Sequence, residues 1–265
     1  MGDEMLGALI GDMAGSRFEW DNYKGKDFQL CHPDCRPTDD SILTIATAAA
    51  LLDQIPFADS YRSWYRRYPD AGYGRSFAAW AAGESRVGYN SYGNGSAMRV
   101  APAGWYGLTL AEVMSLARQS ALPTHDHPQG IAGAQAVATA IFLARTGASK
   151  QQIKRWITKE FSYDLALTPD AIRPGYRFDV TCQGSVPEAL CCFLHSHSFA
   201  DAIRTAVSIG GDSDTIACIS AAVAEAFYGG VPDTLAGWCL ALLDAPQRAV
   251  VERFRGTVMR LAAPD

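Results

Sequence analysis

The chain has 265 residues, of which 48% are hydrophobic and 19% charged, so it can bury a large core and is not intrinsically disordered. A formal net charge of −5 without any basic run argues against a dedicated nucleic-acid-binding protein. We see no export signal and no apolar run long enough to span a membrane. The seven cysteines are scattered, which is a poor disulfide framework. We therefore expect a reduced, cytoplasmic, globular protein.

Apolar residues follow a helical period along most of the chain. The first predicted helix, 3–15, carries Gly7, Gly11 and Gly15 at a spacing of four residues. Each glycine costs about 1 kcal/mol relative to alanine inside a helix, so the stripe predicts that another backbone packs closely there. Further helices are predicted at 41–52, 110–120, 130–145, 199–208, 215–228 and 247–261. Several are apolar on nearly all sides, which is typical of buried helices in a large bundle.

Prolines and glycines interrupt residues 161–187, which predicts a long loop with one short helix. The sequence shows no alternating strand pattern, no βαβ spacing and no internal repeat. It therefore predicts a single all-α domain over residues 1–265, built as a compact multi-helix bundle.

Two acidic clusters stand at the starts of alanine-rich helices. The first is Pro-Thr-Asp-Asp-Ser at 37–41, and the second is Gly-Gly-Asp-Ser-Asp-Thr at 210–215. One Asp, Ser or Thr is enough to cap a helix, whereas neighbouring carboxylates repel each other unless a cation is present. If the two helix starts converge, their oxygen atoms form a site suited to hard divalent cations. Ordinary helix capping is the alternative interpretation.

A third segment, 89–96, has the sequence Tyr-Asn-Ser-Tyr-Gly-Asn-Gly-Ser. Its glycines allow the backbone to approach a phosphate closely, although a plain turn is the alternative. Two competing site types lack support. Cys31, His32 and Cys35 have no second pair of zinc ligands, and a phosphohydrolase would require a strand before Asp212, where Ile-Gly-Gly stands instead.

In chain order, the segments GALIGDMAGSRFE, PTDDS, YGNGSAMRVAPAG, THDHP and GGDSDTIACISAAVAEAFYG resemble the ADP-ribosylglycohydrolase family, of the dinitrogenase-reductase-activating-glycohydrolase type. The resemblance extends from about Leu6 to Gly230. It implies the family's all-α orthogonal bundle. It also implies a hydrolase that removes ADP-ribose from a modified acceptor by metal-assisted attack of water at carbon 1″ of the proximal ribose.

The resemblance also implies roles for particular residues. A centre of two Mg²⁺ or Mn²⁺ ions would be held by Thr38, Asp39, Asp40, Asp212, Asp214 and Thr215. ADP-ribose would bind to Gly93, Asn94, Gly95, Ser96 and His125. Candidates for the catalytic proton acceptor are Glu19, Asp39 and Asp40. Glu19 has no carboxylate beside it in the sequence and lies on a segment predicted to be polar and mobile.

The expected substrate is an ADP-ribosylated protein, nucleic acid or small molecule, and the product is ADP-ribose. The sequence leaves open whether the acceptor is arginine, serine or a nucleic acid. A non-catalytic ADP-ribose-binding protein or a toxin-neutralising immunity protein on the same fold is the alternative. Neither a stable nucleic-acid partner nor a membrane is expected, and the protein is predicted to be a monomer.

Overall fold

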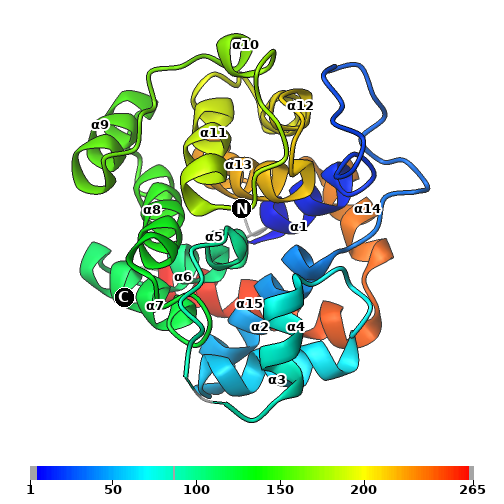
Figure 1. Ribbon diagram of the computed structural model, residues 1–265, viewed down its shortest axis with the longest axis vertical. Helices are drawn as coiled ribbons and strands as arrows, with labels where there is room; N and C mark the ends of the chain where they lie inside the picture. Colours follow the sequence, from blue (N-terminus) through cyan, green and yellow to red (C-terminus); the bar gives the residue numbers. More distant parts are fainter. Residues whose placement is uncertain (1–4, 86, 263–265) are drawn as a thin grey trace.

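Fifteen α-helices make up the regular secondary structure of residues 5–85 and 87–262, which are the residues that the computed structural model describes (Figure 1). They are α1 (Leu6–Gly15), α2 (Asp39–Asp53), α3 (Phe57–Arg67), α4 (Arg75–Ala82), α5 (Gly95–Met98), α6 (Ala101–Tyr106), α7 (Leu110–Ala121), α8 (Pro128–Arg145), α9 (Lys150–Phe161), α10 (Pro169–Ile172), α11 (Cys182–Leu194), α12 (Phe199–Ser208), α13 (Ser213–Tyr228), α14 (Asp233–Leu242) and α15 (Ala245–Ala262). No strand occurs within these ranges, and the predicted all-α fold is confirmed.

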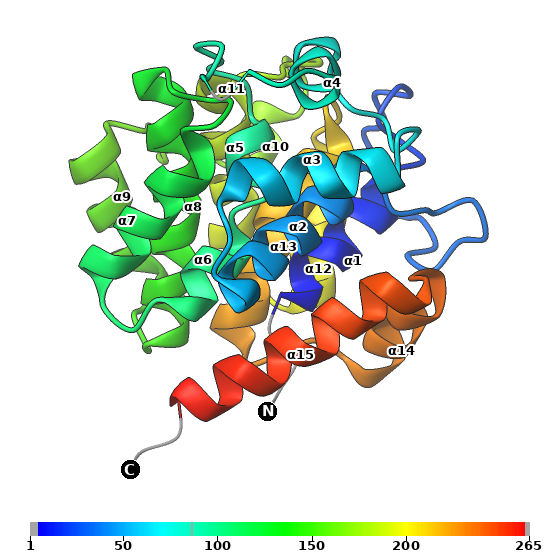
Figure 2. The same cartoon turned by 90° about the horizontal axis from the view of Figure 1, so that it is seen from below.

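The glycine stripe of α1 lies against α13, and the two helices form the centre of the fold (Figures 1 and 2). A Cβ atom added to Gly11 would lie 2.2 Å from the carbonyl oxygen of Ala217. A Cβ atom added to Gly7 or Gly15 would lie 2.5 Å from a carbonyl oxygen of α13. The close packing predicted from the stripe is therefore confirmed, because any side chain at these positions would separate the two backbones.

The other helices surround this central pair. Helices α11 and α12 pack on α13, and α2 packs on α1. Helix α15 lies below α2, while α7, α8 and α9 form one flank (Figure 2). None of the described helices is long and apolar enough to cross a membrane. In this arrangement the first turns of α2 and α13 meet next to α1.

The six later helices predicted from periodicity correspond to α2, α7, α8, α12, α13 and α15, with ends within two residues of the prediction. Helix α1 begins at Leu6, and residues 3 and 4 of its predicted range lie outside the described residues. The loop predicted at 161–187 contains the short α10 but is wrong after residue 181, where α11 begins. Pro187 lies inside α11 and removes one backbone donor from it. The buried neighbours Val186 and Leu190 hold the helix in the core despite this loss.

Candidate active site

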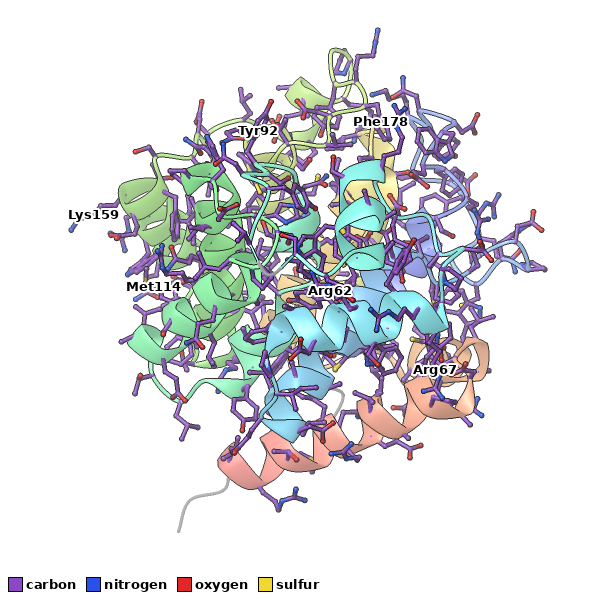
Figure 3. The ribbon with its side chains drawn as sticks, turned by 60° about the horizontal axis from the view of Figure 1, so that its bottom comes forward. Arg62, Arg67, Tyr92, Met114, Lys159 and Phe178 are labelled. Carbon is purple, nitrogen blue, oxygen red and sulfur yellow. The ribbon has the colours of Figure 1, made fainter. Side chains whose placement is uncertain are left out.

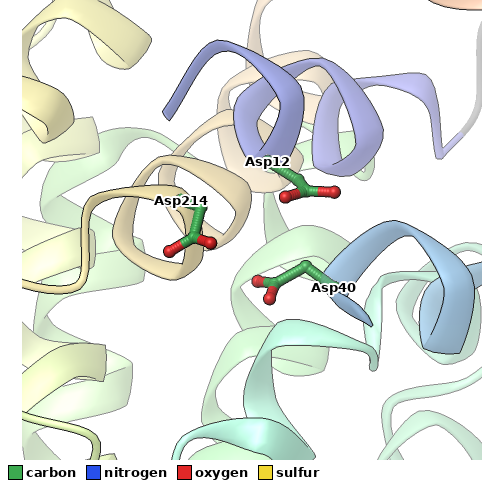
Figure 4. Close-up of side chains that lie close together, drawn as sticks. All are labelled: Asp12, Asp40 and Asp214. Carbon is green, nitrogen blue, oxygen red and sulfur yellow. The ribbon is translucent and has the colours of Figure 1, made fainter. Parts of the chain in front are cut away.

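Carboxylates from three helices meet where α2 and α13 begin. One oxygen each of Asp12, Asp40 and Asp214 lies within 4.8 Å of the other two, and all three residues are buried (Figure 4). The hydroxyl of Thr215 donates a 3.4 Å hydrogen bond to Asp40 Oδ2 and so links the two helix starts. The acidic clusters at 37–41 and 210–215 therefore belong to one site.

Asp12 was missed in the sequence analysis. Its Oδ1 accepts a 2.6 Å hydrogen bond from the Thr38 hydroxyl, and its Oδ2 accepts backbone N–H bonds from Thr38 (2.9 Å) and Ser41 (3.0 Å). The Ser41 hydroxyl also donates to Oδ2. Asp12 thus holds the first turn of α2 in place from α1. The available signal was a single carboxylate in an otherwise apolar helix, since such a group needs partners when it is buried.

A second group of carboxylates shares Asp214 with the first. It contains Glu19, Asp212 and Asp214, again with oxygens within 4.8 Å of one another. Glu19 lies in the turn that follows α1. The carboxylates next to it in space, Asp212 and Asp214, come from the start of α13. The side-chain amide of Asn94 donates to Asp212 Oδ2 at 2.6 Å and fixes that carboxylate.

The site accumulates negative charge away from water. Burial, and then repulsion from neighbouring carboxylates, raises the pKa of Asp40 and Asp214 well above its ordinary value. Burial, followed by the charges of Asp214 and Asp12, raises the pKa of Glu19 to about 7. Burial raises the pKa of Asp212 to about 6. Asp40 Oδ1 is buried without a hydrogen-bond partner. Buried like charges of this kind require protons or cations, so the residues fit divalent metal ions.

Two of the predicted metal ligands, Thr38 and Asp39, do not belong to either group of carboxylates. The Thr38 hydroxyl is the N-cap of α2, where it accepts from the Asp40 backbone N–H and donates to Asp12. Asp39 is half-buried and belongs to neither carboxylate group. It lines the same cavity, and burial together with the charge of Asp214 raises the pKa of its carboxyl group.

A cavity of about 570 Å³ opens beside the carboxylates, which is a volume typical of small-molecule sites. Its walls include Glu19, Asp39, Asp40, Asp212, Asp214 and Thr215, together with Tyr73, Tyr89, Gly93, Asn94, Gly95, Arg99 and His125. Trp20 and Phe178 also line it, and their rings stack with centroids 5.0 Å apart. Both rings are exposed, and Figure 3 shows Phe178 along the same upper edge of the molecule as Tyr92. No local pattern in the sequence indicates this aromatic pair, because Trp20 and Phe178 are far apart in the chain.

The predicted ADP-ribose-binding segment is part loop and part helix. Gly93, Asn94 and Gly95 line the cavity, and the one-turn helix α5 begins at Gly95. Ser96 is fully buried, does not line the cavity and donates its hydroxyl to the carbonyl of Gly130. A Cβ atom on Gly95 would lie 3.2 Å from the ring of His125. Glycine therefore leaves room for the histidine at the cavity wall.

The sequence matches the profile of the ADP-ribosylglycohydrolase family over residues 4–263, nearly its whole length. The chain belongs to this family. It is 28% identical to ADP-ribosylhydrolase ARH3 of Mus musculus, and the match covers 85% of this chain and 82% of that protein. It is also 24% identical to an ADP-ribosylarginine hydrolase of Pseudomonas putida, covering 85% of this chain and 69% of that protein.

A solved structure described as an ADP-ribosylglycohydrolase-related protein complex has the same fold as this family member. The TM-score is 0.72, with 97% of both chains covered and 24% sequence identity. The fold expected from the family resemblance is thus found in the structure, and the acidic site lies at its centre.

Proposed function

We propose that this protein is an ADP-ribosyl hydrolase, which releases ADP-ribose from a modified acceptor by attack of water at carbon 1″ of the proximal ribose. The observation that carries the proposal is one cavity whose lining combines carboxylates of both groups, Asp214 among them, with the glycines of the predicted ADP-ribose-binding segment and with His125. The names of the relatives in mouse and Pseudomonas putida support the same class of reaction. The proposal covers N- and O-glycosidic links to arginine, serine or nucleic acid.

The acidic site would hold two Mg²⁺ or Mn²⁺ ions. Its proposed ligands are Thr38, Asp39, Asp40, Asp212, Asp214 and Thr215, and Glu19 lies beside Asp212 and Asp214 without being one of them. When bound, two such cations would offset the buried negative charge and lower the pKa of a water molecule. Asp12 contributes by holding the first turn of α2, and with it Asp40, in place.

A carboxylate of the chain would take the proton from the attacking water. Glu19, Asp39 and Asp40 are the candidates, and all three line the cavity. Glu19 is the most suitable of them because Asp39 and Asp40 are proposed metal ligands, whereas Glu19 lies outside that ligand set and keeps its carboxylate for the proton. The remaining carboxylates would stabilise the positive charge that develops on the ribose in an oxocarbenium-like transition state.

The proposal is tested with a panel of defined substrates that carry ADP-ribose on arginine, on serine or on a nucleic acid. We expect release of ADP-ribose from at least one of them with added Mg²⁺ or Mn²⁺, and none after treatment with a chelator. Asp214→Asn serves as the control for release by a contaminating enzyme. If the protein binds ADP-ribose tightly but releases it from no substrate under any metal condition, the non-catalytic alternative is correct.

A further inference from the structure

Arg99 is a fully buried cation beside the cavity. Its guanidinium lies 4.2 Å from the ring centroid of Tyr61, and its Nη2 donates hydrogen bonds to the carbonyl of Ser120 (3.0 Å) and the hydroxyl of Thr124 (2.7 Å). Its Nε and Nη1 atoms are buried without a hydrogen-bond partner. In residues 5–85 and 87–262, no carboxylate forms a salt bridge with it. Its positive charge therefore remains available to an anion in the cavity that it lines.

The contact of Arg99 with Thr124 determines the hydrogen bonding of His125. Thr124 Oγ1 lies 2.7 Å from His125 Nδ1. Because a guanidinium can only donate, the hydroxyl accepts from Arg99 and keeps its single proton for another acceptor. Within the described part of the chain, His125 Nδ1 is the remaining side-chain partner of that hydroxyl. Arg99 Nη2, the Thr124 hydroxyl and His125 Nδ1 all have hydrogen-bond partners when Nδ1 accepts from the hydroxyl. The imidazole proton then lies on Nε2.

The Nε2 edge of His125 lies against the two glycines of the predicted ADP-ribose-binding segment. A Cβ atom would be 3.5 Å from Nε2 if added to Gly93, and 3.2 Å if added to Gly95. No protein group in the described residues forms a hydrogen bond with Nε2, and the ring lines the cavity. Burial, and then the nearby Arg99, lowers the pKa of the imidazole well below its ordinary value, which keeps the ring neutral. His125 therefore presents one N–H donor, Nε2–H, to the cavity.

We propose that Arg99 and Thr124 are positioning residues that hold His125 as the neutral Nε2–H tautomer, so that this N–H donates to a diphosphate oxygen held against Gly93 and Gly95. The identity of the ligand rests on the proposed function, whereas the tautomer follows from the protein contacts alone. A diphosphate oxygen can only accept hydrogen bonds, and the opposite tautomer would direct a lone pair at it. The charge of Arg99 adds a favourable interaction with the same anion.

The tautomer is measured by long-range ¹H–¹⁵N NMR correlation of the ligand-free protein, in which the two neutral tautomers and the imidazolium give different nitrogen shifts. The His125 signals are assigned by their loss in His125→Gln. We expect Nε2–H in the wild-type protein and in Thr124→Ser, which keeps the hydroxyl. Thr124→Val removes the hydroxyl at nearly the same volume and should move the signals toward the other tautomer.

Calorimetric titration of the same variants with ADP-ribose tests the consequence for binding. A hydrogen bond to a charged group is strong enough that Thr124→Val should weaken binding about 10- to 100-fold, and Thr124→Ser should restore it. Melting curves establish that each variant is folded, and the wild-type spectrum is informative even if a variant is not. These spectra and affinities would together support the proposal.

Three results would overturn parts of the proposal in different ways. A wild-type His125 that carries its proton on Nδ1, or both protons, overturns the tautomer assignment. An unchanged spectrum and affinity in Thr124→Val overturn the role of Thr124. A wild-type protein with the expected tautomer that binds no ADP-ribose overturns the proposed function and the ligand named here, while supporting the tautomer.

Discussion

Two buried aspartates of the candidate metal site have opposite surroundings. Asp12 receives hydrogen bonds at both carboxylate oxygens from Thr38 and Ser41. Asp214 lies close to Asp40 and Asp212, and burial together with the charges of Asp212 and Asp12 raises its pKa well above the ordinary value. Neutralising Asp12 should therefore remove stabilising hydrogen bonds, whereas neutralising Asp214 should relieve repulsion between carboxylates.

This contrast gives a prediction for two isosteric variants in a chelator. Asp12→Asn should lower the free energy of unfolding by about 2–3 kcal/mol, because its NH₂ group faces N–H and O–H donors that had bonded to a charged group. Asp214→Asn should raise the melting temperature of the metal-free protein and abolish stabilisation by Mn²⁺. Urea unfolding and calorimetric Mn²⁺ titration measure both effects. Equal destabilisation by the two variants would contradict this account of the site.

Glu19→Gln separates catalysis from binding at the same site. We expect the variant to bind metal ions and ADP-ribose as the wild type does, because the other carboxylates and the glycine segment are intact. Loss of a general base should lower kcat by about 10²–10⁴-fold. Steady-state kinetics on a competent substrate and calorimetric titrations provide the measurements.

Glu188→Gln is the matched control for that variant. Burial raises the pKa of Glu188 to about 7 as well, yet Glu188 lies on α11 and does not line the cavity. Its replacement should leave kcat unchanged. Normal turnover by Glu19→Gln would exclude Glu19 as the proton acceptor, and loss of a bound metal would make it a ligand.

At the scale of helices, the α1–α13 contact joins the core to the site. Asp12 lies on α1 next to Gly11, and Asp214 lies at the start of α13 next to Gly15. Because the glycines set the distance between the two backbones, they also set the distance between these carboxylates.

Gly11→Ala is therefore expected to damage both stability and metal binding. Its Cβ would lie 2.2 Å from the carbonyl oxygen of Ala217, so the helices must separate. We expect a loss of about 1–3 kcal/mol in the free energy of unfolding, as is typical of overpacked cores. Gly237→Ala in α14 is the control, since its Cβ would meet nothing within 4 Å and the change should stabilise by about 0.5–1 kcal/mol. Urea unfolding and Mn²⁺ titration of both variants test this, and equal effects would contradict it.

The elements show what the sequence could and could not predict. The starts of α2 and α13 were predictable because acidic residues directly precede long apolar helices. Helix α9 was missed because most of its residues are polar and it buries few side chains, Ile153 and Ile157 among them, so it contains no long apolar run. Helix α11 was not predicted, because Pro187 in it indicated a loop.

The parts of the site that the sequence did not predict depend on contacts between residues far apart in the chain. Asp12 bonds to residues 26 and 29 positions further along the chain, and Glu19 meets carboxylates of α13. Arg99 directly follows α5 and Thr124 lies between α7 and α8, so these residues, 25 positions apart, are brought together only by the packing of helices. No local pattern contains such pairs, because each member alone is an ordinary buried polar residue.

Considered as a whole, the protein places its most unfavourable charges next to the central helices of its hydrophobic core. The carboxylate groups lie between α1, α2 and α13, whose buried apolar residues belong to the hydrophobic core. Since apolar burial provides most of the stability of a folded protein, the core can hold these carboxylates together even though they repel each other. The repulsion depends on protonation and on bound cations, so the stability of the molecule should depend on both.

The metal-free protein should become less stable as the pH rises from about 4 to about 7. In the folded state the pKa of Asp212 is about 6 and that of Glu19 about 7, above their ordinary values of 3.8 and 4.5. The folded state therefore binds more protons than the unfolded state in this range, and the free energy of unfolding falls as these protons are lost. His125 acts in the opposite direction because its pKa is lowered, but it is one group against several carboxylates.

Divalent cations should reverse this pH dependence, because they bind the deprotonated carboxylates and stabilise only the folded state. We expect melting curves in a chelator to shift to lower temperature between about pH 5 and about pH 8, and Mn²⁺ to raise the melting temperature more at the higher pH. Asp214→Asn, with one charge fewer, should show a smaller shift in the chelator and little response to Mn²⁺. A chelated wild-type protein that melts at the same or a higher temperature at the higher pH would show that the buried carboxylates are not in mutual repulsion. The metal site would then lose its electrostatic basis, because no stored repulsion would remain for the cations to relieve.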